Sequence, residues 1–217
     1  MKNLFIILLA FIGIPALAQS QYTPDTEAKS ILDKTAQALQ KTTGAQAAFT
    51  LTIENNQTNE KQTLSGALWL KGNKFKLVAD DIETYYNGKT QWVYMVDEDE
   101  VTVSTPTADE LQDINPTLII SSYKTGYKLK KDSDATVDGK AAFVVCIYPD
   151  DRTKPYHRIE ILIEKSSYNI LSINTYGKNG TNTLIKIKKY ERDVSLADSL
   201  FAFDEKKYPN AEVIDLR

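Results

Sequence analysis

The chain has 217 residues, of which 25% are charged and 42% are hydrophobic, and its formal net charge is −3 at pH 7. About 200 residues can bury one hydrophobic core, and all-β barrels of this length commonly form a single domain. Since acidic residues outnumber basic ones, no basic excess favours nucleic acid as a partner.

The first residues have the pattern of an export signal. Met1-Lys2 opens a weakly cationic segment, residues 4–14 form an apolar run, and Ala16-Leu17-Ala18 supplies a small-x-small cleavage site. The apolar run is too short to span a bilayer, and no cysteine follows the cleavage site to receive a lipid. We therefore expect residues 1–18 to be a cleaved signal peptide and residues 19–217 to form one exported domain.

A helix and then a strand are predicted at the start of this domain. Thr23-Pro24-Asp25 offers a cap followed by a first-turn proline, and apolar residues recur at helical spacing from Ala28 to Leu39. Gly44 ends this pattern. Residues 47–54 then alternate between apolar and polar side chains, which is the period of a strand with one face in water.

Two further sets of strands are predicted, separated by short turns rich in Gly, Asn and Asp. Such turns favour antiparallel hairpins, and no βαβ rhythm appears. The fold class is therefore mainly β, of the α+β type. The predicted strands cover residues 61–71, 74–78, 82–86, 90–96 and 100–104 in the first set, and 126–131, 141–148, 156–165, 170–176 and 183–190 in the second.

The segment between the two sets, residues 106–123, breaks the β pattern. Leu111 and Ile114 fit one short helical turn, and Asn115-Pro116 caps a second turn that carries Leu118 and Ile119. These turns could cover a cavity as a lid, or they could plug one end of an ordinary barrel.

Two motifs in the first strand set resemble those of a known family. Gly66-Ala67-Leu68-Trp69-Leu70-Lys71, closely followed by Phe75, and Gly88-Lys89-Thr90-Gln91-Trp92-Val93-Tyr94 resemble the LolA family of periplasmic carriers, which ferry lipoproteins to the outer membrane. The resemblance continues more weakly through Asn115-Pro116, Phe201-Ala202-Phe203 and Val213-Ile214-Asp215.

The resemblance implies an incomplete antiparallel β-barrel, or half-barrel, with an N-terminal helix and short lid helices over an apolar cavity. Such a cavity suits the cargo, since each methylene exposed to water costs roughly 0.8 kcal/mol. By resemblance, Phe75 and Leu77 face the cavity. The period-2 alternation of strands extends this expectation to other strands. The added cavity residues are Trp92, Tyr94, Val145, Ile147, Ile161 and Ile163, and the lid residues are Leu111, Ile114, Leu118 and Ile119.

The family also implies a location and partners. We expect a periplasmic monomer without a cofactor that binds acylated lipoproteins, collects them from an inner-membrane ABC transporter and delivers them to an outer-membrane acceptor. Family members often carry an arginine just after the Trp-x-Lys motif that holds the lid shut. This chain has Gly72-Asn73 there, so we expect its lid to be held differently.

Other functions have less support in the sequence. His157 is the only histidine, and it lies in neither a G-x-S-x-G elbow nor a zinc-binding spacing, so no enzyme activity is expected. Cys146 is the only cysteine, so no internal disulfide can form. The acidic clusters at 97–100 and 150–151 lack the glycine pattern of an EF-hand, and no metal is expected. A related binding module, which senses lipoproteins or carries another lipid or amphiphile, remains the alternative.

Overall fold

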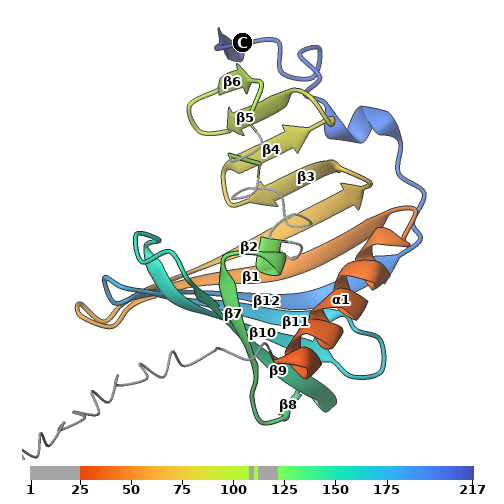
Figure 1. Ribbon diagram of the computed structural model, residues 1–217. Coiled ribbons are helices and arrows are strands. Elements are labelled where there is room, and N and C mark those ends of the chain that lie inside the picture. Colours follow the sequence, from red (N-terminus) through yellow and green to blue (C-terminus); the bar gives the residue numbers. More distant parts are fainter. Residues whose placement is uncertain (1–24, 108–109, 112–121) are drawn as a thin grey trace, which may run out of the picture.

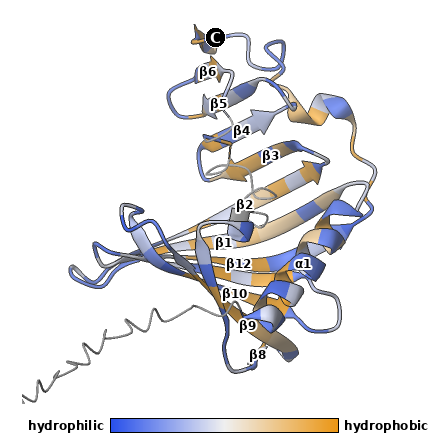
Figure 2. Cartoon of the chain, in the orientation of Figure 1, coloured by the Kyte–Doolittle hydropathy of each residue, from blue (hydrophilic) through white to orange (hydrophobic). Residues whose placement is uncertain are grey.

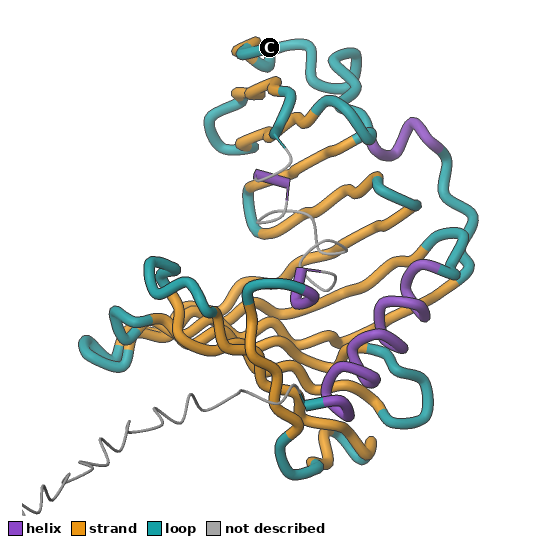
Figure 3. Tube along the Cα trace, viewed as in Figure 1, coloured by secondary structure: helices purple, strands orange, loops and turns teal. Residues whose placement is uncertain are grey.

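The structure is a curved sheet of strands with helix α1 lying across part of one face (Figures 1 and 3). The computed structural model describes residues 25–107, 110–111 and 122–217. The first elements are α1 (Thr26–Gln40), β1 (Ala45–Asn55), β2 (Glu60–Lys71), β3 (Lys74–Ala79), β4 (Ile82–Tyr86), β5 (Gln91–Met95) and β6 (Glu100–Ser104). They are followed by η1 (Ser122–Lys124), β7 (Tyr127–Lys131), β8 (Ala135–Val137), β9 (Lys140–Pro149), β10 (Tyr156–Glu164), β11 (Ile170–Gly177), β12 (Thr181–Arg192), η2 (Asp198–Phe201) and β13 (Glu212–Asp215).

The strands follow one another in the sheet almost as they do in the chain. The order is β13-β6-β5-β4-β3-β2-β1-β12-β11-β10-β9-β7, and β8 pairs with β9. Neighbouring strands are antiparallel except for the parallel pair β13 and β6. Because the two end strands of this order do not pair with each other, the barrel stays incomplete. The predicted half-barrel with an N-terminal helix is confirmed.

Most of the predicted strands match the observed ones to within a few residues. The hairpin turns between them contain residues with positive φ, such as Gly72 at 59° and Asp99 at 52°. The short strand β8 was not predicted. The structure also extends β12 by two residues at each end compared with the prediction, to Thr181 and Arg192.

Helix α1 begins at a cap that also joins it to the sheet. Oδ1 of Asp25 accepts a hydrogen bond from the backbone N–H of Ala28 at 2.9 Å, and Oδ2 accepts one from the backbone N–H of Lys131 in β7 at 2.7 Å. These bonds, the one from Ala28 first, lower the pKa of Asp25. The cap is thus Asp25 itself, while the predicted cap at Thr23 lies outside the described residues.

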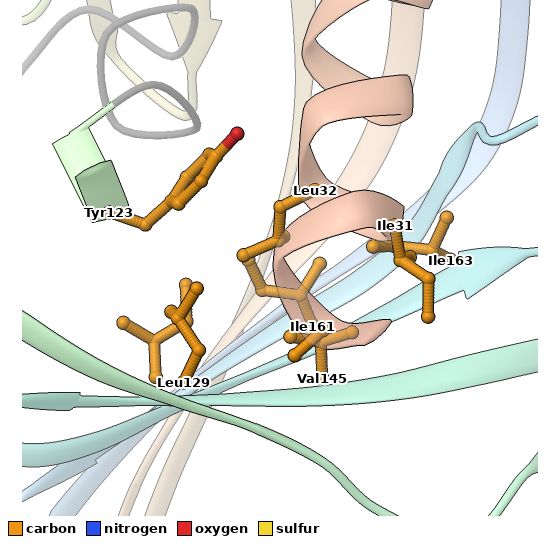
Figure 4. Packing of buried hydrophobic residues seen from close by; sticks show 9 residues of the cluster. Ile31, Leu32, Tyr123, Leu129, Val145, Ile161 and Ile163 are labelled. Carbon is orange, nitrogen blue, oxygen red and sulfur yellow. The ribbon is translucent and has the colours of Figure 1, made fainter. Parts of the chain in front are cut away.

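A core lies between α1 and the second half of the sheet (Figure 4). Ile31 and Leu32 of the helix point down onto Val145, Ile161 and other side chains of β9 and β10, and Leu32 is fully buried. The buried helix residues form one face because they recur at helical spacing; they are Ala28, Ile31, Leu32, Thr35 and Ala36. Figure 2 shows the same arrangement as apolar strand segments beneath α1.

A separate cluster lies on the other face of the sheet, over β4 to β6. It joins Tyr85, Tyr94 and Val101 to Phe203 from the C-terminal segment. The ring of Phe203 lies 5.2 Å from that of Tyr94 and 4.9 Å from that of Tyr208. The chain after β12 therefore returns over the convex face before β13 pairs with β6.

Candidate functional site

A cavity of about 440 Å³ lies on the concave face, between α1 and the sheet. Its volume is within the roughly 300–1,000 Å³ of sites that take small ligands. Most of its walls are aliphatic or aromatic. It is lined by Thr35, Ala38, Leu39, Ala45, Gln46, Ala47, Phe49, Leu51, Leu68, Leu70, Phe75, Leu77, Ala79, Thr84, Gln91, Tyr168, Asn169, Ile170, Ile173, Ile185, Ile187, Tyr190 and Arg192.

Strand register explains why the floor of this cavity is apolar. Leu51 of β1 pairs with Ile185 of β12, and Ile185 pairs with Ile173 of β11. Residues that lie opposite one another in neighbouring strands point to the same face of a sheet. An apolar row therefore crosses three strands beneath the cavity.

Phe75 and Leu77 lie where the sequence placed them, in the cavity wall. Phe75 is 1% exposed, and its ring lies 5.5 Å from the ring of Tyr86 on the neighbouring strand. Lys76 lies between them and points to the other face, where its Nζ lies 4.5 Å from the centre of the Tyr85 ring. Strand β3 thus turns Phe75, Leu77 and Ala79 to the cavity and its two lysines to the other face, as period-2 alternation requires.

The placement of Trp92 and Tyr94 on the cavity side needs correction. Trp92 pairs with Tyr85, which pairs with Lys76, so these side chains share the convex face. Both Trp92 and Tyr94 belong to the cluster around Phe203. The hydroxyl of Tyr94 donates a hydrogen bond to Asp99 at 2.8 Å, and this bond raises the pKa of Tyr94 to about 12. Gln91 faces the cavity instead. The pairing of β5 with β4 therefore places the odd-numbered residues of β5 on the cavity side, one residue away from the predicted positions.

The four residues predicted on β9 and β10 lie in the core beneath α1 rather than in the cavity wall. Ile161 pairs with Ile173, which lines the cavity, so the predicted face of this strand agrees with the register. The helix covers this part of the face, however, and each of the four is at most 4% exposed. They are Val145, Ile147, Ile161 and Ile163.

Of the predicted lid residues, Leu111 is the one that the structure describes. Ile114, Leu118 and Ile119 lie outside the described residues. Leu111 packs against the cluster that contains Phe75, and Leu77 packs against the same cluster. The carboxylate of Glu110 accepts from the backbone N–H of Thr107 at 2.7 Å, and the hydroxyl of Thr107 accepts from the backbone N–H of Glu110 at 3.3 Å, which is the pattern of a capping box. The lid itself stays a prediction.

Several wall residues were missed by the sequence reasoning. Phe49 and Leu51 belong to an alternating run that predicted a strand, and this alternation already indicated one buried face. Tyr190 and Arg192 had no such signal. They face the cavity because a β-bulge at Lys188 shifts the register of β12 against β1.

The described part of the chain shows neither a metal cluster nor a membrane-spanning helix. No three or more His, Cys, Asp or Glu side chains among its residues lie together as metal ligands would. None of its helices combines the length and the apolar character needed to cross a membrane. Burial raises the pKa of the Cys146 thiol, as expected for a core cysteine.

Solved structures share this fold at low sequence identity. An uncharacterised conserved protein from Thermus thermophilus is 14% identical with a TM-score of 0.59, over 87% of this chain and 99% of that one. The Mycobacterium tuberculosis lipoprotein LppX is 13% identical with a TM-score of 0.51, over 80% and 100%. The structure of the Pseudomonas aeruginosa MucA/MucB complex contains a match that is 16% identical with a TM-score of 0.53, over 83% and 62%.

Sequence comparison identifies the family. No curated protein matches the chain. A family model described as outer membrane lipoprotein carrier protein LolA matches residues 18–174, which include helix α1, the cavity wall from β1 to β5 and most of β11. This match confirms the resemblance carried by the two motifs around Trp69 and Trp92, and the chain belongs to the LolA family.

Proposed function

We propose that this protein is a periplasmic carrier that shields the acyl chains of lipoproteins in its concave cavity and moves them from the inner to the outer membrane. The observation that carries the proposal is an apolar cavity of about 440 Å³ within a family of lipoprotein carriers. The cavity has no catalytic constellation among the described residues that line it, and LolA-like proteins are binding carriers rather than enzymes.

The physical reason for a carrier is the cost of exposing acyl chains to water. At roughly 0.8 kcal/mol for each methylene, a chain of ordinary length would cost about 10 kcal/mol outside a membrane. The row of Leu51, Ile185 and Ile173 offers apolar contact without directional bonds. Dispersion and burial then hold the ligand, and release does not require many hydrogen bonds to break.

The proposal includes export and partners. Residues 1–18 act as a cleaved signal peptide, an inner-membrane ABC transporter supplies the lipoprotein, and an outer-membrane acceptor receives it. The predicted lid around Leu111 closes over the cavity. The monomer works alone, since one cavity already lies within one chain.

Bound material provides the first test. The protein purified from its host should carry acylated lipoproteins or diacylglyceryl peptides that mass spectrometry identifies. Phospholipid or another amphiphile in their place would favour a different lipid-binding function, and a partner protein without acyl chains would favour a sensor.

A pair of variants tests where the acyl chains bind. Leu51→Glu places a carboxylate in the cavity wall, and because an unpaired buried charge costs several kcal/mol, acyl binding should weaken at least about 100-fold. Thr52→Glu is the matched control, because Thr52 lies on the opposite face and its hydroxyl lies 3.1 Å from that of Thr63. Titration with a fluorescent acyl probe measures both. Equal binding by the two variants would show that the acyl site lies elsewhere.

A further inference from the structure

One wall of the cavity carries a positive charge. Arg192 is the one charged residue among the described residues that line it. Its Nη2 donates to the backbone carbonyl of Ser167 at 2.9 Å, and its Nε is buried and has no hydrogen-bond partner within the described part of the chain. A guanidinium has five N–H donors. Arg192 therefore keeps donor capacity that its protein neighbours do not use.

No carboxylate of the described residues lies within 4.0 Å of Arg192 to neutralise this charge. The two acidic neighbours in sequence are engaged elsewhere. Glu191 forms an ion pair with Lys189 at 2.6 Å, and Oδ1 of Asp193 accepts from the backbone N–H of Thr43 at 3.3 Å. A partly buried cation normally has an opposite charge beside it, because desolvation of a lone charge is costly. The missing counter-charge points to a ligand.

A β-bulge aims Arg192 into the cavity. Ala48 of β1 pairs with Lys189, but the next residue, Phe49, pairs with Ile187, so Lys188 is an extra residue in β12. Bulges of this kind re-aim the side chains that follow them. If β12 alternated regularly through Lys188, the alternation that puts Ile187 in the cavity would turn Arg192, five residues later, to the convex face. The fold thus departs from regular pairing to place this cation inside.

Other polar groups lie at the same end of the cavity. Tyr190 precedes Arg192 on the same face, and its ring centre lies 5.7 Å from the guanidinium carbon. Oδ1 of Asn169, in the wall beside Ser167, is buried without a partner within the described residues. Lys34 of α1 donates to the hydroxyl of Tyr168 at 3.2 Å and adds a second positive charge at the rim. The rest of the wall is mainly apolar, so the cavity itself is amphipathic.

We propose that Arg192 binds an anionic group, a carboxylate or a phosphate, that lies next to the acyl chain of the cavity's ligand. This inference rests on the proposed acyl-binding function. The anion is a carboxylate of the peptide beside the acylated cysteine if the ligand is a lipoprotein, and the head group if the ligand is another acyl lipid. The acyl chain lies over the row of Leu51, Ile173 and Ile185, and the head lies at the end of β12. A charge-assisted hydrogen bond contributes enough to make the anionic ligand about 10- to 100-fold tighter than an uncharged one.

The experiment compares ligands with the same chain and different heads. Hexadecanoate, hexadecanoyl lysophosphatidate and methyl hexadecanoate displace an uncharged fluorescent probe from the unmodified protein. The two anions are used below their micelle concentrations and the ester below its solubility limit. Tighter binding of one or both anions than of the ester is expected, and the stronger of the two tells a carboxylate site from a phosphate site. Equal binding of all three would overturn the assignment of Arg192 while leaving acyl binding intact. Failure of all three to bind would instead contradict the proposed function.

Variants locate the preference. Arg192→Gln keeps a donor for the Ser167 carbonyl and removes the charge, so the ratio of anion affinity to ester affinity should fall to about one. Lys188→Gln is the matched control, because it removes one positive charge from an exposed position on the same strand. Arg192→Lys should keep most of the preference. An anion preference that survives Arg192→Gln in a folded protein would overturn the role of Arg192.

Discussion

At the scale of single residues, Asp25 shows how one side chain holds two separate parts of the chain. Its two carboxylate oxygens accept backbone N–H groups from the first turn of α1 and from β7, 106 residues away. Each bond satisfies a donor that the helix end or the sheet edge would otherwise leave unpaired. The position of α1 over the cavity therefore depends on a capping residue as well as on its apolar face.

Asp25→Ala should destabilise the protein by about 1–2 kcal/mol at pH 7, because it removes the cap and the bond to β7. The pKa of Asp25 is lowered in the folded state, so its contribution is present above the ordinary Asp pKa of about 4 and is lost as the pH falls below it. Urea unfolding at pH 7 and at pH 3 measures this effect. If the difference in unfolding free energy between parent and variant were larger at pH 3 than at pH 7, the assigned role of Asp25 would be contradicted.

At the scale of elements, the segment that follows β12 is held by the buried ring of η2 as well as by the cluster around Phe203. Phe201 of η2 is fully buried, and η2 packs against β3 and β4. Asp198, at the start of η2, accepts from Lys71 at 2.8 Å and from Lys74 at 2.9 Å, and these two bonds lower its pKa to about 2. Its side chain is 64% exposed, so solvent screens the ion pairs.

Two substitutions separate these contributions. Phe201→Ala should lower the free energy of unfolding by about 3–5 kcal/mol, because it removes a large buried side chain and leaves a cavity. Asp198→Asn should leave the urea midpoint almost unchanged at pH 7, because exposed ion pairs add little. Chemical unfolding of both variants beside the parent checks this order. If Asp198→Asn proved the more damaging change, the ion pairs would be what holds the segment.

At the scale of the whole molecule, ligand and fold should stabilise each other. A ligand that fills the cavity contacts α1, strands β1 to β5 and strands β11 and β12 at once, and it binds the folded chain alone. When the free ligand is at 100 times its Kd, it adds about 2.7 kcal/mol to the free energy of unfolding. This raises the Tm of a protein of this size by roughly 5–10 °C. Thermal unfolding with and without acyl ligand measures the shift. At the same ligand concentration, the Leu51→Glu variant should show a shift of about 1–2 °C or less.

The fold was largely predictable, and the site only in part. Turns such as Gly72-Asn73 and Asn87-Gly88 are local signals, so the strands between them could be placed from sequence. The faces of these strands depend on register, which is set by pairing between chain segments. Phe75 and Leu77 lie on the predicted face of β3. Trp92 lies on the face opposite to the predicted one, because the pairing of β5 with β4 puts it beside Tyr85. The bulge at Lys188, which turns Arg192 inward, left no trace that one sequence could reveal.

The parallel pairing of β13 with β6 has a consequence for how the chain matures. Residues 212–215 cover the edge of β6, yet they are synthesised about 110 residues after the strand they protect. Until they arrive, that edge offers open backbone groups to any passing strand. The newborn protein is thus most prone to faulty pairing while β6 is made and residues 212–215 are not, and a chain that stops before residue 212 should associate through β6.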